Sequence, residues 1–98
     1  MARSYILNYV HCVFSTKQRA QLIRDPEFLW AYIRGIARNC KFDILAIGGT
    51  ANHVHILLTW PASRNLADVM RDIKANSSRH MRELGVRFAW QDAILVSV

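Results

Sequence analysis

The chain has 98 residues, of which 52% are hydrophobic and 20% charged, a composition typical of one folded domain with no room for a second. Its formal net charge of +6 favours a polyanionic partner, although a solvated basic surface fits the charge about as well. Two cysteines without a Cys-x-x-Cys spacing exclude a disulfide framework and a zinc knuckle, and no apolar run is long enough to span a membrane, so we expect reduced thiols in a cytoplasmic protein.

The first half of the chain predicts a strand, a basic loop and a helix. Aromatic and β-branched residues predominate in SYILNYVHCVFST, which indicates a long first strand with Tyr9 and His11 on the same face. A polar loop follows this strand. Asp25 as N-cap and Pro26 at the first helical position then begin a helix over DPEFLWAYIRGIARNC.

The second half predicts two strands, a longer helix and a last strand. KFDILAIGGT indicates a second strand, whose Gly48-Gly49 pair supplies the backbone of a tight hairpin connection to a third strand, HVHILLTW. Apolar residues at helical spacing in SRNLADVMRDIKANSSRHMRELG predict a helix that Gly85 ends, and VRFAWQDAILVSV is β-like to its last residue. This βαββαβ order predicts an α+β fold, a ferredoxin-like sandwich with a four-stranded antiparallel sheet and both helices on one face.

The third strand contains two histidines separated by one apolar residue. Alternation places His53 and His55 on one side of the strand, whereas Val54, Ile56 and Leu58 point to the helix-covered side. Two imidazoles this close can converge on one metal ion, which would retain open positions for phosphate oxygens. Ordinary half-exposed histidines, hydrogen-bonded to their neighbours, remain the alternative interpretation.

Four stretches of the chain together resemble a known family. These stretches are HCVFSTKQR, GGTANHVHILL, IKANSSRH and FAWQD. In this order and spacing, over residues 5 to 92, they resemble the single-tyrosine HUH transposases of bacterial insertion sequences and their repeat-associated relatives. The resemblance implies that His53 and His55 bind a divalent metal, Mg²⁺ or Mn²⁺.

The resemblance also implies a reaction and its partners. Members of this family bind single-stranded DNA folded into a hairpin, and they nick and rejoin it through a phosphotyrosine intermediate. They work as homodimers whose sheets meet edge to edge. A second copy also suits a chain of this size, because a small core leaves little stability to spare.

The chain departs from the family after FAWQD. In the family, a further strand and a helix follow, and that helix carries the nucleophilic tyrosine and, four residues on, a Gln or Glu metal ligand. We therefore expect that the single domain over 1–98 lacks the tyrosine-bearing helix, that no catalytic residue is identifiable in it, and that it transfers strands poorly if at all. Tyr32 lies on an apolar helical stripe, which predicts packing and not catalysis, and His11 and Tyr9 are candidates for support around the metal ligands.

The basic residues predict a DNA-binding surface in two segments. One segment is the loop after the first strand, and the other is the second helix. The candidate DNA contacts are Lys17, Arg19, Arg71, Lys74, Asn76, Ser78 and Arg79. Two rivals stay open at this point: a remnant that binds DNA hairpins without cutting them, and a ferredoxin-like RNA-binding module indifferent to loss of His53.

Overall fold

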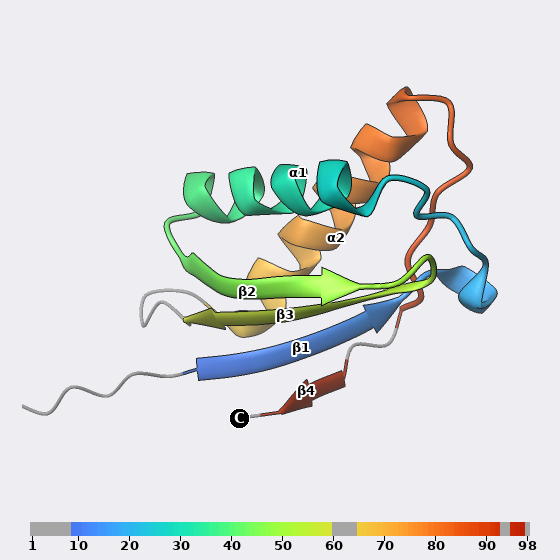
Figure 1. Cartoon of the computed structure of the whole chain (residues 1–98). Helices are drawn as coiled ribbons and strands as arrows, with labels where there is room; N and C mark the ends of the chain where they lie inside the picture. Colours follow the sequence, from blue (N-terminus) through green and yellow to red (C-terminus); the bar gives the residue numbers. More distant parts are fainter. Residues whose placement is uncertain (1–8, 60–64, 93–94, 98) are drawn as a thin grey trace, which may run out of the picture.

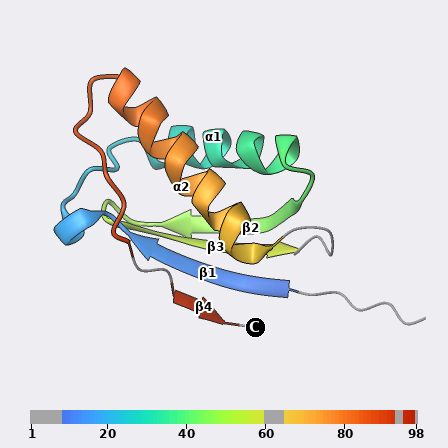
Figure 2. The ribbon, with the colours of Figure 1, turned by 180° about the vertical axis from the view of Figure 1, so that it is seen from behind.

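The computed structural model describes residues 9–59, 65–92 and 95–97. In chain order its elements are β1 (Tyr9–Ser15), the short 3-10 helix η1 (Lys17–Arg19), α1 (Pro26–Asn39), β2 (Asp43–Gly49), β3 (His53–Thr59), α2 (Leu66–Glu83) and β4 (Leu95–Ser97). Figures 1 and 2, which view the molecule from opposite sides, show both helices on the same face of the sheet. Among the described residues, no helix covers the other face.

The strands pair antiparallel in the order β2-β3-β1-β4. β1 and β3 pair over their full length, from Tyr9 opposite Thr59 to Ser15 opposite His53. The body of the sheet is therefore β2, β3 and β1, and the three-residue β4 pairs with one end of β1 at the edge. The α+β class, the antiparallel sheet and the two helices on one face are confirmed.

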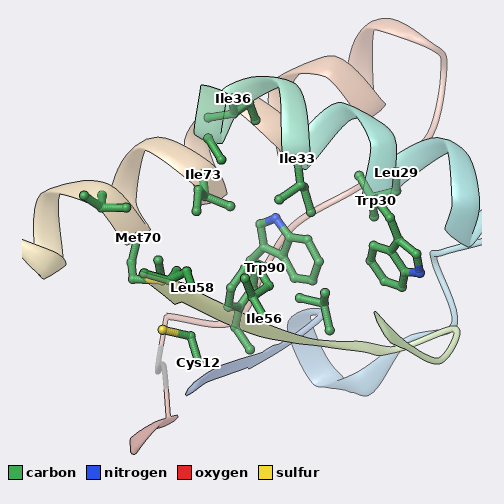
Figure 3. Close-up of a cluster of buried hydrophobic side chains, with 14 of the residues drawn as sticks. Cys12, Leu29, Trp30, Ile33, Ile36, Ile56, Leu58, Met70, Ile73 and Trp90 are labelled. Atoms are coloured by element: carbon green, nitrogen blue, oxygen red, sulfur yellow. The ribbon is translucent and has the colours of Figure 1, made fainter. Parts of the chain in front are cut away.

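The core lies between the sheet and the two helices (Figure 3). Alternate residues of β1 and β3 are almost completely buried there, and α1 and α2 contribute the opposing layer: Val10, Cys12, Phe14, Val54, Ile56, Leu58, Leu29, Ile33, Val69, Met70 and Ile73. Full burial of each large apolar side chain stabilises the fold by roughly 1.5–3 kcal/mol. Burial also raises the pKa of the Cys12 thiol to about 11. Cys12 and Cys40 are both free thiols, as expected.

Both helices begin, and α2 ends, where local chemistry predicts. The Asp25 side chain accepts a hydrogen bond from the backbone N–H of Phe28, and Asn65 caps α2 in the same way through Ala67 at 2.8 Å. Just beyond the end of α2, Gly85 has a φ of +88°, which glycine adopts without strain. Within the described ranges, no helix is both long enough and apolar enough to cross a membrane.

The hairpin between β2 and β3 differs from its prediction. Gly48 and Gly49 lie inside β2 and pair with β3, and residues 50–52 form the turn instead. The Thr50 N–H donates to the His53 carbonyl at 3.0 Å and closes that turn. Glycine is required at Gly49 because a Cβ there would lie 2.1 Å from the His53 carbonyl oxygen. The glycine pair therefore permits close strand pairing and does not itself make the turn.

The prediction of one strand over 86–98 is wrong for its first half. Residues 86–92 form no strand, although Trp90 makes an isolated bridge with Thr16. Phe88 and Trp90 are buried, and the Trp90 indole N–H donates to the Ser77 hydroxyl of α2 at 2.9 Å. This segment therefore crosses from α2 to the end of β1 as an anchored loop, because its aromatic side chains bind the core and not a neighbouring strand.

Candidate functional site

β3 presents two histidines on the face of the sheet opposite the helices. His53 is half-buried and His55 is exposed, whereas Val54 and Ile56 beside them are fully buried. The centroids of the two imidazole rings are 4.9 Å apart, and the rings meet edge to face at 75°. Strand alternation therefore brings both rings to one open surface, as the sequence predicts.

A third imidazole joins them from the neighbouring strand. His11 of β1 lies diagonally across from His55, because His55 pairs with Val13 in the β1–β3 register. The Nε2 atom of His11 is 3.2 Å from Nδ1 of His55, and the two rings stack at a centroid distance of 5.3 Å. The register places His53 and His11 on opposite sides of His55, so the three rings form a row.

The surroundings of His55 favour its neutral form. Desolvation lowers its pKa below the ordinary value of 6.5, and the charges of His53 and His11 lower it further. A neutral imidazole has one nitrogen with a lone pair, which is the form that binds metals. His55 is therefore an uncharged ligand candidate near neutral pH.

The imidazole of His53 is hydrogen-bonded to the turn that precedes it. Its Nδ1 atom lies 3.0 Å from Oδ1 of Asn52 and 2.8 Å from Oγ1 of Thr50. The hydrogen bonds of the described residues reach both motif rings at Nδ1, so Nε2 of each ring is left for another partner. Asn52 and Thr50 are not among the site residues that the sequence predicts. Their position, as polar residues immediately before the His-Val-His motif, was the available signal.

The two histidines fit a divalent cation whose remaining ligands come from water or phosphate. Two adjacent imidazoles supply two nitrogen ligands, and the uncovered face leaves room for water or phosphate oxygens. In the described part of the chain, no group of three or more His, Cys, Asp or Glu side chains is arranged to hold a metal. Binding through the protein alone would therefore use the His53 and His55 pair.

Part of the predicted DNA-binding surface lies beside this pair. The loop that carries Lys17 and Arg19 is bonded to the turn before His53, because the Thr16 N–H donates to the Asn52 carbonyl at 2.9 Å. The Asn52 amide also donates to the Arg19 carbonyl at 3.5 Å. Lys17 further lines a surface hollow of about 640 Å³ together with residues of the 89–92 segment.

The predicted contacts on α2 lie elsewhere. α2 belongs to the helical layer, and the sheet separates it from the histidines (Figures 1 and 2). Asp68 pairs with Arg71, Asn76 and Glu83 engage Arg79, and the Ser78 hydroxyl is mostly buried and donates to the Ala75 carbonyl. The structure therefore brings the loop that carries Lys17 and Arg19 to the turn before His53, and it does not bring the α2 residues there.

A groove of about 460 Å³ runs along α2 beside the 89–92 segment. Arg71, Lys74 and Arg82 line it from the helix, and Trp90 and Asp92 line it from the opposite side. The Lys74 ammonium donates to the carbonyl oxygens of Gln91 and Asp92. Desolvation lowers the pKa of Lys74, against the opposing charge of Asp92. Lys74 thus ties the loop to α2 as well as contributing charge.

The described tyrosines are divided between the two sides of the sheet. Tyr32 stacks on His80 of α2 with centroids 3.9 Å apart and rings within 3° of parallel, so it packs between the helices, as predicted. His80 also stacks on Phe28, so its ring packs against two aromatic side chains of α1. Tyr9 lies on the open face, on the same side of β1 as His11, and it is 43% exposed.

Comparisons with known proteins find similar solved structures and a matching family. Among solved structures, the chain is similar to a protein assigned as a transposase of Deinococcus radiodurans R1, with a TM-score of 0.87 and 22% identity over 100% of this chain and 84% of that one. It is also similar to the REP-associated tyrosine transposase bound to a REP hairpin, with a TM-score of 0.70 and 22% identity over 99% of this chain and 59% of that one. Comparison with the curated proteins gives no match. Residues 4–94 match the family described as "Transposase IS200 like", and the chain therefore belongs to the IS200-like transposase family.

Proposed function

We propose that the chain binds single-stranded DNA hairpins and that His53 and His55 hold Mg²⁺ or Mn²⁺ where the phosphodiester would lie. The observation that carries this proposal is the adjacency of two imidazoles on an open face, where no hydrogen bond from the described residues reaches Nε2 of either ring. The basic loop of Lys17 and Arg19 lies at the same end of β3. A similar structure, described as bound to a REP hairpin, supports the choice of partner.

The chemistry assigns separate tasks to the residues around the site. A bound divalent cation would offset charge on the scissile phosphate. His53 and His55 would hold that ion as neutral ligands, and the Lys17 and Arg19 side chains would attract the flanking phosphates. At family level, a tyrosine oxygen then bonds to phosphorus while the bond from phosphorus to the leaving oxygen breaks, so the bond energy is conserved for rejoining.

His11 and Tyr9 are proposed as supporting residues. When the Nδ1–H of His55 donates to Nε2 of His11, the lone pair of His55 lies on its own Nε2, toward the open face. His11 would therefore orient His55 and select its tautomer. Tyr9 lies two residues from His11 on the same side of β1, where it would flank the site without touching a ligand.

Metal binding is tested by calorimetry with Mn²⁺. Replacing His53 or His55 with alanine should weaken Mn²⁺ binding by at least about tenfold, because a two-histidine site retains only one protein ligand. Thr59→Val is the matched control, since Thr59 lies on the same face of β3 but outside the histidine row. If the native protein releases no binding heat, the two histidines are ordinary hydrogen-bonded surface residues.

DNA binding is tested with labelled hairpin DNA over a range of salt concentrations. The double variant Lys17→Gln/Arg19→Gln should bind the hairpin more weakly than native protein. In a plot of the logarithm of the binding constant against the logarithm of the salt concentration, its slope should be shallower by about 1.4, since each lost phosphate contact on a single strand contributes about 0.7. Arg71→Gln/Arg79→Gln, on the other side of the sheet, should have the smaller effect. The opposite ranking would place the DNA on the helical layer.

The 98 residues are proposed to bind hairpins without transferring strands. Tyr32 lies across the sheet from the histidines, and among the described residues no side chain forms a hydrogen bond with the Tyr9 hydroxyl. Incubation with hairpin DNA and Mn²⁺ should therefore give no covalent protein–DNA adduct. An adduct would establish a nucleophile within the chain. Preference for RNA, unchanged by His53→Ala, would instead favour an RNA-binding module.

We also propose that the fold is a ferredoxin-like sandwich whose fourth strand is β4, which pairs with β1 at one edge of the sheet. Two copies of this chain would then form a homodimer through their sheet edges. β2 lies at the opposite edge, where Leu45 is 49% exposed beside an irregularity in the pairing. Exposed apolar side chains at a sheet edge favour association. Light scattering should give twice the chain mass, and Leu45→Lys should shift the mass toward the monomer if β2 forms the contact.

A further inference from the structure

We infer that Asn52, assisted by Thr50, is the positioning residue that holds the proton of His53 on Nδ1 and so leaves Nε2 as the metal-binding lone pair. The inference deepens the proposed function and rests on it for the metal. Three short contacts connect these groups: Asn52 Oδ1 to His53 Nδ1 at 3.0 Å, Thr50 Oγ1 to His53 Nδ1 at 2.8 Å, and Thr50 Oγ1 to Asn52 Oδ1 at 3.0 Å.

The three contacts are satisfied together by only one arrangement of hydrogens. The Asn52 amide nitrogen donates to the Arg19 carbonyl, so the amide oxygen is the atom that faces His53. The Thr50 hydroxyl has a single hydrogen, and it donates that hydrogen to the same amide oxygen. Both oxygen atoms then offer only lone pairs to Nδ1. His53 must donate from Nδ1, because an unprotonated Nδ1 would set two acceptors against each other at 3.0 Å.

The backbone holds Asn52 firmly in this position. The fully buried Thr16 donates its N–H to the Asn52 carbonyl at 2.9 Å, and its hydroxyl, which bonds to the Ala20 carbonyl at 2.6 Å, joins the same segment to the loop. The Thr50 N–H donates to the His53 carbonyl, and the Asn52 N–H approaches the Thr50 hydroxyl at 3.4 Å. Because the acceptor is fixed before any ligand arrives, the ring is oriented without further loss of conformational entropy on binding.

Asn52 also connects the imidazole to the basic loop. Its carbonyl is bonded to the residue before Lys17, and its side chain reaches the Arg19 carbonyl. The position of the proposed metal ligand is thus coupled to the position of the proposed phosphate contacts. A change at Asn52 should therefore affect both metal and DNA affinity, whereas a change at Thr50 should affect mainly the metal.

The tautomer is measured on the metal-free protein by long-range ¹H–¹⁵N NMR of the histidine rings. At a pH where His53 is neutral, native protein should show the proton on Nδ1. Asn52→Ala should shift His53 toward the tautomer with the proton on Nε2, whereas Asn52→Asp should keep it on Nδ1, since a carboxylate oxygen also accepts. Thr50→Val removes the hydroxyl at constant shape, and Thr50→Ser restores it. A native His53 with its proton on Nε2 would overturn the inference.

Calorimetry with Mn²⁺ supplies a second readout. Asn52→Ala should weaken binding by about 10- to 100-fold, the usual effect of removing a group that orients a metal-binding histidine. Asn52→Asp and Thr50→Ser should remain within a few-fold of native, as should the matched control Thr59→Val. If native protein has the Nδ1 proton but binds no Mn²⁺, the positioning stands and the proposed metal function fails. If native protein binds Mn²⁺ and Asn52→Ala binds equally well, the positioning fails and the metal function stands.

Discussion

The two faces of β3 are held in place by different forces. On the covered face, Val54, Ile56 and Leu58 have no exposed surface, and their positions follow from packing against two helices. On the open face, His53 and His55 are positioned by hydrogen bonds from the preceding turn and from β1. Stability is therefore concentrated on one side of a single strand, and binding chemistry is free to occupy the other.

The largest expected effect tests the division between the two faces directly. Ile56→Ala should lower the free energy of unfolding by about 2–5 kcal/mol, because it leaves a cavity in the core. Its neighbour His55→Ala should change that free energy by no more than about 0.5 kcal/mol, as is usual at an exposed position. Urea denaturation measures both. Similar losses for the two variants would show that the open face is covered in solution.

The β2–β3 hairpin offers a comparison between adjacent glycines. Gly49→Ala should cost roughly 1–3 kcal/mol, because the new Cβ would meet the His53 backbone. Gly48→Ala meets nothing within 4 Å and should stay within about 0.5 kcal/mol of native. The first variant should also weaken Mn²⁺ binding, since it displaces the backbone of a proposed ligand. Equal thermal stability of the two variants would contradict the close strand approach at Gly49.

A buried polar contact anchors the loop on the covered side. Ser77→Ala should cost about 1–3 kcal/mol, because the Trp90 indole N–H would lose its buried acceptor. The cost should be smaller when Trp90 is already phenylalanine, and a double-mutant cycle measures that coupling. DNA and metal affinity should change little, since this contact lies across the sheet from the histidines. Additive effects would show that the two residues act independently.

The smallest expected effect is the dependence of stability on pH, which arises from proton binding by His55 on the open face. The pKa of His55 is lowered mainly by desolvation and then by His53 and His11, so the unfolded chain binds the proton more tightly than the folded one. Stability should therefore fall slightly as pH decreases from about 6.5 toward the pKa of the folded state. NMR titration should place His55 below 6.5, and His53→Ala or His11→Ala should raise its pKa. A native value above 6.5 would contradict the crowding of these rings.

Local patterns were sufficient for much of this architecture. The alternation in HVHILLT predicted which side chains are buried, because strand geometry alone alternates the two faces. The caps Asp25 and Asn65 lie at helix starts, as short-range hydrogen bonding requires, although only the first was singled out in advance. The glycine pair was misassigned because a strand that needs close approach and a turn that needs unusual angles both favour glycine.

The sequence by itself determined the α+β class, the covered and open faces of β3, and the presence of two histidines on the open one, because these follow from periodicities of two and 3.6 residues. The tertiary structure decided the rest: that His11 meets His55, that Asn52 and Thr50 meet His53, and that the 86–92 segment crosses to β1 as a loop. Those contacts depend on strand register and on which buried aromatic side chains find room, and both are set by the packing of residues far apart in the chain.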